Sequence, residues 1–163
     1  MGRRRRPAAP GAMAGPAGIY RILDANLNRS REGLRVCEDI SRFVLNSGAI
    51  SARLKSIRHA VTALMTALPE GRAMLLRSRD SDNDVSAGSR TATEMRRADA
   101  ADIFFANIQR AKESLRVLEE FSKLADERAA SGFRRLRFRV YGVEKDTMGR
   151  TGPLRHTGRL GPR

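Results

Sequence analysis

ANLNRSREGLRVCEDIS, residues 25–41, returns 81 positions later as ANIQRAKESLRVLEEFS, residues 106–122. The segments that follow the two copies also match, because Leu54, Ile57 and Arg58 correspond to Phe133, Leu136 and Arg137 at a spacing of 79. A long internal repeat indicates one supersecondary unit used twice. We therefore predict an all-α, antiparallel helical bundle built from two repeated helical hairpins, with a pseudo-twofold axis between the long helices.

The helical signals place the two repeat halves at residues 20–68 and 99–145, within a single domain of residues 19–146. Capping residues, helix breakers and hydrophobic spacing set the bounds within the halves. The expected elements are helices over 20–45 and 51–68, one helical turn over 70–76, a loop over 77–90, a helix that resumes at 91, breaks near 98–99 and runs to 125, and a last helix over 126–145.

Both ends of the sequence are predicted to be disordered basic tails, residues 1–18 and 147–163, because Gly, Pro and Arg dominate them. Met13 is an alternative start, a few residues before the helical pattern begins. The net charge of +14 comes from 32 basic and 18 acidic residues. Much of the excess lies in the tails, so it gives little support to a nucleic-acid-binding face.

Several classes of protein are excluded by composition. No run of 18 apolar residues occurs, so we expect no membrane segment. Cys37 is the single cysteine, which rules out an intrachain disulfide and suits a reducing, cytoplasmic location. Cys37 and the two histidines are too few for a zinc site with four Cys or His ligands.

On a helical wheel, the repeated segment has one apolar face that includes small residues at Ser30 and Gly33. Small residues allow two helices to approach closely, whether from the second hairpin or from a partner chain. Asn26 and Asn107 project from this face and are flanked by Arg29 and Arg110. These polar groups need partners if buried, so they form either a network that sets the helix register or a charged cavity between the hairpins.

Arg35 and Arg116 fall farther round the helix, beside acidic residues at helical spacing. They are part of a charged surface with ion pairs, or they belong to the same cavity. The predicted loop contains RDSDND, residues 79–84. It departs from a calcium loop because Val85 stands where glycine is required. Asp80 and Asp84 are candidate Mg²⁺ ligands, with Arg79 beside them for a phosphate; a solvated loop is the alternative.

Four strings, YRILDANLNRSREGLRVCEDISRFVLN, RSRDSDNDVS, RRADAADIFFANIQRAKESLRVLEEFSKL and LRFRVYGVEK, carry a resemblance that spans residues 20–145. In this order the chain resembles a small bacterial family of monofunctional hydroxymethylpyrimidine phosphate kinases of thiamine biosynthesis. Members of that family occur alone or fused ahead of thiamine-phosphate synthase. The sequence after residue 145 is too short for a synthase, so the resemblance is to the stand-alone form.

The resemblance implies that ATP, with Mg²⁺, phosphorylates hydroxymethylpyrimidine monophosphate to the diphosphate, and that the free alcohol is refused. It also implies a functional link to thiamine-phosphate synthase, with no nucleic-acid or membrane partner. A homodimer stays open. By residue type and repeat position, the expected site comprises catalytic Arg29, Arg110 and Lys123; phosphate-binding Arg35, Arg79 and Arg116; substrate-binding Asn26, Asn107, Tyr20, Phe105 and Tyr141; and metal-binding Asp80 and Asp84.

Three other functions compete with this one. A basic helical module could bind nucleic-acid phosphates through the arginine-rich segment Arg134, Arg135, Arg137 and Arg139. A small all-helical enzyme similar to chorismate mutase would use arginines and an amide on a dicarboxylate, without metal. A scaffold or domain-swapped dimer would bind no phosphate compound.

Overall fold

The computed structural model describes residues 15–68, 71–78 and 97–155. All regular structure in those residues is helical, which confirms the all-α prediction. The helices are α1 (Pro16–Phe43), α2 (Gly48–Thr66), α3 (Gly71–Ser78), α4 (Ala100–Ser122), α5 (Glu127–Met148) and α6 (Gly152–Arg155).

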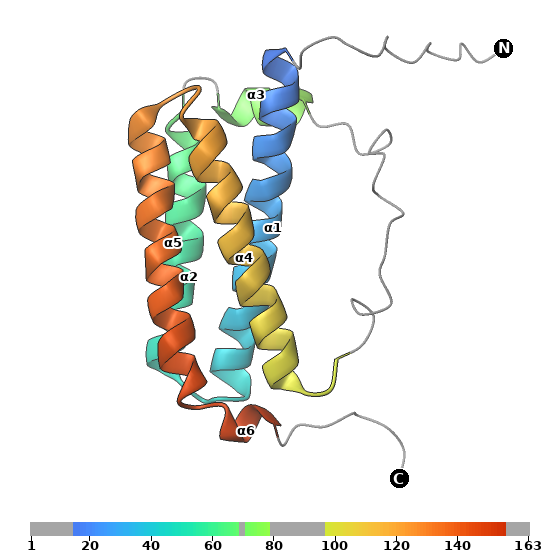
Figure 1. Ribbon diagram of the computed structural model, residues 1–163, viewed down its shortest axis with the longest axis vertical. Helices are drawn as coiled ribbons and strands as arrows, with labels where there is room; N and C mark the ends of the chain where they lie inside the picture. Colours follow the sequence, from blue (N-terminus) through green and yellow to red (C-terminus); the bar gives the residue numbers. More distant parts are fainter. Residues whose placement is uncertain (1–14, 69–70, 79–96, 156–163) are drawn as a thin grey trace, which may run out of the picture.

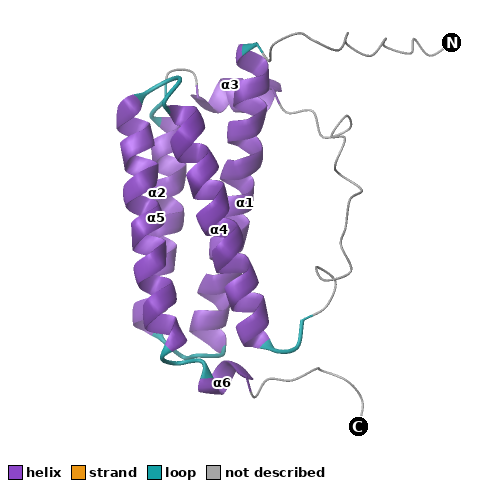
Figure 2. Ribbon diagram, viewed as in Figure 1, coloured by secondary structure: helices purple, strands orange, loops and turns teal. Residues whose placement is uncertain are grey.

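Four long helices stand side by side in a bundle (Figures 1 and 2). α1 contacts α2 and α4, and α5 contacts the same two helices, so each long helix has two neighbours. Figure 1 shows that neighbouring helices run in opposite directions. The antiparallel bundle is therefore confirmed, and its two hairpins are α1–α2 and α4–α5. The pseudo-twofold axis itself stays a prediction.

Helix bounds follow local chemistry. α1 begins at Pro16, whose missing N–H costs nothing in the first turn, so it starts before the expected residue 20. Asn46, with φ 48°, occupies the left-handed conformation that reverses the chain before α2. Asp99 caps α4 by accepting a hydrogen bond from the N–H of Asp102 (2.9 Å), and Asp126 caps α5 through the N–H of Arg128 (2.7 Å).

The predicted bounds of the two tails and of the loop are wrong where the structure describes them. Residues 16–18 lie in α1, and the first two residues of the predicted 77–90 loop lie in α3. At the other end α5 continues to Met148, and α6 follows within the predicted tail. Thr147 and Leu154 are fully buried, so this segment is held by packing in spite of its Gly- and Arg-rich composition. Residues 1–14, 79–96 and 156–163 lie outside the described part.

The two short helices lie at opposite ends of the bundle (Figure 1). α3 follows the first hairpin and contacts α1 and α2, whereas α6 follows the second hairpin and contacts α4. Each contributes a buried leucine, Leu75 and Leu154, and these two are again 79 positions apart. The two leucines thus occupy corresponding places after the two hairpins, although α3 contacts both helices of its hairpin and α6 contacts α4.

The two hairpins approach closely at Gly33, where α1 packs against α4. A Cβ at this position would lie 2.7 Å from the carbonyl oxygen of Asn107 and 3.6 Å from the Cβ of Ala111. Glycine in a helix interior costs about 1 kcal/mol relative to alanine. The absence of a side chain here lets the two backbones meet, as the small-residue face predicts.

Cys37 lies in the hydrophobic core and donates a hydrogen bond to the carbonyl oxygen of Phe104 (3.5 Å). Burial raises the pKa of its thiol far above the usual range, and the nearby charge of Glu144 raises this pKa further. The thiolate is the reactive form of cysteine.

We expect iodoacetamide at pH 8 to modify Cys37 of the unfolded chain much faster than Cys37 of the folded protein, as measured by mass spectrometry. Equal rates in buffer and in urea would contradict the buried position.

Candidate functional site

The same ion pair occurs in both hairpins. In the first, Glu38 of α1 accepts a hydrogen bond from Nε of Arg58 of α2 (3.0 Å). In the second, Glu119 of α4 accepts from Nη2 and Nε of Arg137 of α5 (2.7 and 3.1 Å). Both carboxylates are buried. Each pair joins the two helices of its own hairpin at matching positions of the repeat.

A second arginine extends each pair on the surface. Arg35 lies 3.8 Å from Glu38 and 3.1 Å from Asp39, and Arg116 lies 2.9 Å from Glu119 and 2.8 Å from Glu120. Both arginine side chains are about half exposed, at 55% and 54%. The predicted ion pairs at helical spacing are therefore present, and they leave both guanidinium groups open to solvent.

These contacts alter the electrostatics of the second hairpin. The pKa of Arg137 is raised, first by its hydrogen bond to Glu119 and then by one to the hydroxyl of Tyr141 (2.8 Å). The pKa of the Glu120 carboxyl is lowered, chiefly by a hydrogen bond from Lys123 (2.9 Å) and then by the charge of Arg116. Glu119 and Glu120 are thus both paired with basic side chains of the same hairpin.

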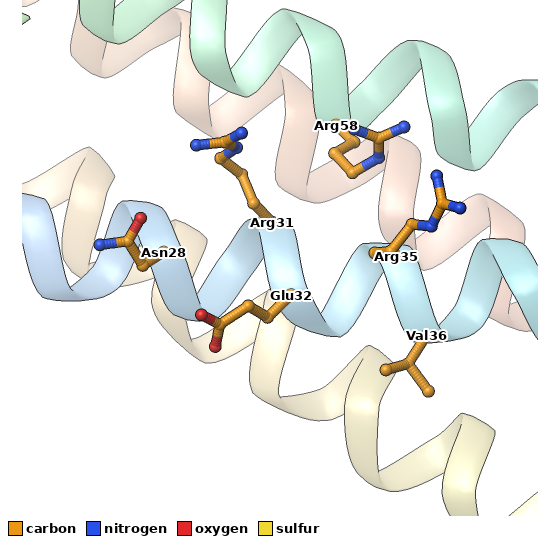
Figure 3. Close-up of a pocket in the computed structure, with 6 residues that line it drawn as sticks. All are labelled: Asn28, Arg31, Glu32, Arg35, Val36 and Arg58. Carbon is orange, nitrogen blue, oxygen red and sulfur yellow. The ribbon is translucent and has the colours of Figure 1, made fainter.

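A basic cavity of about 460 Å³ lies over α1 and α2 in the first hairpin (Figure 3). Its lining residues are Asn28, Arg31, Glu32, Arg35, Val36 and Arg58. Arg31 and Arg35 extend from α1 toward the same side as Arg58 of α2, and the carboxylate of Glu32 points away from all three guanidinium groups (Figure 3). Nε of Arg31 is buried and has no hydrogen-bond partner among the residues that the structure describes.

Other cavities lie over the second hairpin and between the hairpins. One of about 320 Å³ is lined by Glu119, Lys123, Glu127, Ala130, Ser131 and Arg134. Another of about 400 Å³ lies between α2 and α5, with apolar walls around Leu64 and Leu136. The first of these brings Lys123 close to the Glu119 ion pair, whereas the second contains no residue of the predicted site.

The structure brings some of the predicted site residues together and separates others. Arg35 lies in the basic cavity, and Arg116, Lys123 and Tyr141 lie around the ion pair of the second hairpin. Arg29 and Arg110 are exposed on α1 and α4, within about one helical turn of the close contact at Gly33. Neither of them lines any of the three cavities.

Asn26 and Asn107 each donate a hydrogen bond to a carbonyl oxygen of their own helix, Ile22 (2.9 Å) and Ile103 (2.8 Å). Their hydrogen-bond partners are thus in their own helices, and neither amide N–H bonds to the other asparagine or to the opposite hairpin, contrary to the predicted network between the hairpins. Tyr20 and Phe105 are partly buried against the core, and the Phe105 ring packs edge-on against Phe104. None of these four residues lines the three cavities.

Arg79, Asp80 and Asp84 lie outside the described residues, so the structure gives no geometry for the expected metal site. Within residues 15–68, 71–78 and 97–155, no group of three or more His, Cys, Asp or Glu side chains could hold a metal ion. In the same residues no helix has the length and apolar character needed to cross a membrane.

The arginines proposed for nucleic-acid binding have protein partners. Arg137 bonds to Glu119, Arg135 donates to Ser131 (2.9 Å), and Arg139 donates to Ser56 of α2 (3.1 Å). Arg134 stacks over the ring of Phe138. Among the described residues, only Arg137 of these four arginines is paired with an acid, whereas Arg134, Arg135 and Arg139 remain exposed.

Two residues of the basic cavity were missed by the sequence analysis, Arg31 and Arg58. The repeat could have identified Arg58, because it corresponds to Arg137 and the acids that they pair with, Glu38 and Glu119, also correspond. The repeat could have identified Arg31 as well. Lys112 is its counterpart in the second copy, so the repeat keeps a basic residue at this position.

Comparison with known proteins gives a family match over most of the chain. The model of the ThiD2 family matches residues 21–146. The chain is also similar to proteins named thiamine-phosphate synthase: 39% identical over 128 residues to that of Rhodopirellula baltica, 40% over 136 residues to that of Synechocystis, and 40% over 131 residues to that of Nostoc punctiforme. These alignments cover 78%, 83% and 80% of this chain but 34%, 38% and 36% of the relatives. The chain thus spans little more than a third of the length of the curated relatives it matches. No solved structure matches it.

Proposed function

The chain belongs to the ThiD2 family, and from this premise we propose that it is a hydroxymethylpyrimidine phosphate kinase of thiamine biosynthesis. The family match over residues 21–146 is the observation that carries the proposal. The relatives named thiamine-phosphate synthase support the connection to thiamine. Such a synthase uses a pyrimidine diphosphate, which phosphorylation of the monophosphate would supply. A helical kinase unit could do this either fused to the synthase or as a separate protein.

The proposed reaction moves a phosphoryl group from ATP to a phosphate oxygen of the substrate. That oxygen attacks the γ-phosphorus, the bond from this phosphorus to the β-phosphate oxygen breaks, and ADP leaves. The attacking oxygen is ionised at pH 7, so the protein need not supply a strong base. Alignment and neutralisation of the phosphate oxygens are then its main tasks.

Arginine side chains are suited to both tasks because their planar forks bind phosphate through two hydrogen bonds. In the proposal Arg29 and Arg110, both within about one helical turn of Gly33, contact the transferred group, and Arg35, Arg79 and Arg116 hold the phosphate chains. Lys123 lies 13 residues beyond Arg110, about 20 Å along α4, so we do not place it at the same phosphoryl group. Phe105 and Asn107, which lie near the crossing at Gly33, are the predicted residues best placed to recognise the pyrimidine. Tyr20 lies 13 residues before Gly33, about 20 Å along α1, and is too far from them to contact the same ring. Asp80 and Asp84 would hold Mg²⁺, which neutralises phosphate charge when bound.

Refusal of the free alcohol follows from the same chemistry. A site built for an existing phosphate leaves its guanidinium groups without partners when a neutral alcohol binds, and unpaired buried polar groups are costly.

The proposal predicts that the full chain, with ATP and Mg²⁺, converts hydroxymethylpyrimidine monophosphate to the diphosphate and leaves the free alcohol unchanged. Product is measured by coupling to a separate, active thiamine-phosphate synthase. Arg29→Ala and Arg110→Ala should each lower kcat/KM at least tenfold, the loss expected from one charged hydrogen bond.

Arg42→Ala is the matched control for these two variants. It removes an exposed arginine from α1 that stacks on Phe43, far along the helix from Arg29. Its activity should equal that of the unchanged protein. Turnover of neither compound would refute the kinase, and full activity in both arginine variants would refute their phosphate contacts.

A further inference from the structure

The first hairpin lacks one carboxylate that the second hairpin has. The ion pairs of Glu38 with Arg58 and of Glu119 with Arg137 align the two halves side chain by side chain. At the same spacing of 81, Arg31 of α1 corresponds to Lys112 of α4. Lys112 has an acidic partner and Arg31 has none among the described residues. This difference indicates which hairpin could bind an anion.

Lys112 has a complete set of partners. Its Nζ donates to both carboxylate oxygens of Glu144 at 2.7 Å and lies 5.7 Å from the centre of the Tyr141 ring. Only 15% of the Lys112 side chain and 23% of the Glu144 side chain are exposed. The cation of the second hairpin is therefore neutralised within the fold.

Arg31 has no such partner because the repeat changes on the facing helix. At the spacing of 79 that relates the second helices, Met65 stands for Glu144 and Thr62 for Tyr141. Met65 is fully buried and offers no charge. Nε of Arg31 is consequently buried without a hydrogen bond, in a part of the structure where Glu38 and Asp39 are already paired with Arg58 and Arg35.

Arg31 lines the cavity and has no acidic partner among the described residues, so a bound anion would supply the partner that its guanidinium lacks. The side chains around Arg31 define that anion. Arg35 and Arg58 line the same cavity. Glu32 lines it too, but its carboxylate points away from the three guanidinium groups (Figure 3), so the cations outnumber the one acid. The volume of about 460 Å³ is ample for a phosphate group with a small substituent. Arginine forks favour an anion with several oxygens over a simple halide.

We propose that the cavity over α1 and α2 is a phosphate-binding site whose principal ligand is Arg31. The second hairpin has no equivalent site, because the corresponding cation, Lys112, is already paired with Glu144. The ligand class is a phosphate monoester or the terminal phosphates of a nucleotide. The assignment rests on the proposed kinase function only for the identity of the group that carries the phosphate. It gives the two repeats different roles, one open to an anion and one closed by its own carboxylate.

Inorganic phosphate tests the site without requiring catalysis. In isothermal titration calorimetry at constant ionic strength, the full chain should bind phosphate, and Arg31→Met should weaken that binding at least tenfold. Lys112→Met removes the matching cation of the second hairpin and should leave the affinity for phosphate unchanged. Arg42→Met controls for the loss of one positive charge on α1.

Thermal unfolding separates a binding role from a structural one. Arg31→Met removes a buried N–H that has no partner, so without phosphate its Tm should equal or exceed that of the unchanged protein. Phosphate should raise the Tm of the unchanged protein and not that of the variant. Equal phosphate affinity in both proteins, or a lower Tm of Arg31→Met with no response of either protein to phosphate, would overturn the proposal.

Kinetics then identify the bound group and keep the two proposals distinct. A rise in KM for the pyrimidine monophosphate in Arg31→Met assigns the cavity to the acceptor, and a rise in KM for ATP assigns it to the donor. If phosphate binding depends on Arg31 but no kinase activity is found, the kinase function fails and the site stands. Unchanged kinetics and unchanged phosphate affinity in the variant would remove the site and leave the kinase function intact.

Discussion

Glu119→Ala is expected to lower the free energy of unfolding by about 3 kcal/mol, the lower end of the range for breaking a buried ion pair. The loss arises because the substitution removes the acidic partner of Arg137. That side chain is 13% exposed and donates two hydrogen bonds to the Glu119 carboxylate. Without the carboxylate, a largely buried guanidinium keeps only its bond to Tyr141. Urea unfolding at pH 7, followed by circular dichroism, measures the loss.

Two further variants identify the cause of the loss. Glu119→Leu combined with Arg137→Met removes both charges and should recover most of the stability, because apolar replacements of a buried pair are often neutral. Glu120→Ala removes an exposed carboxylate from the same helical turn and should have little effect, since exposed ion pairs contribute little. If the double variant is no more stable than Glu119→Ala, the loss does not come from the unpaired arginine.

Gly33→Ala is expected to destabilise the bundle by about 2 kcal/mol, within the range found for overpacked cores. Alanine is the better helix former by about 1 kcal/mol, so propensity alone predicts the opposite sign. Packing decides the outcome, because the new methyl would lie 2.7 Å from the Asn107 carbonyl oxygen, a backbone atom that cannot move without α4. The midpoint of urea unfolding should fall without a change in its slope.

Gly142→Ala is the matched control, since Gly142 lies inside α5. A Cβ there would meet only the end of the flexible Arg53 side chain, at 3.4 Å. This variant should be up to about 1 kcal/mol more stable than the unchanged protein. If Gly33→Ala were stabilised equally, the two hairpins would not be in close contact at Gly33.

The helices and their pairing could be predicted because the determinants are local or repeated. Asp126 marks the start of α5 through its cap, and Asn46 marks the reversal between α1 and α2. The repeat predicts two hairpins, and Gly33 predicts where they meet. The C-terminal segment could not be predicted from composition, because it is held by tertiary contacts: Leu154 is buried and Arg155 lies 4.0 Å from Asp99.

The site was harder to predict for a physical reason. Periodicity shows that Arg31 and Lys112 occupy equivalent positions, but whether a cation is satisfied depends on the facing helix. Glu144 pairs with Lys112 from 32 residues away in sequence, and Met65 fails to provide the same partner to Arg31. Asn26 shows the converse, because a residue expected to bond across the bundle bonds within its own turn.

The contact at Gly33 also determines the order in which this bundle can assemble. Each hairpin joins helices that are adjacent in sequence, so α1–α2 and α4–α5 close small loops and can form quickly. Gly33 and Asn107 are 74 positions apart, and they meet only after the chain between the hairpins has closed a much larger loop. We therefore expect docking of the two hairpins to be slower than closure of either one. Because both backbones must meet at this crossing, the two halves reach their native state together.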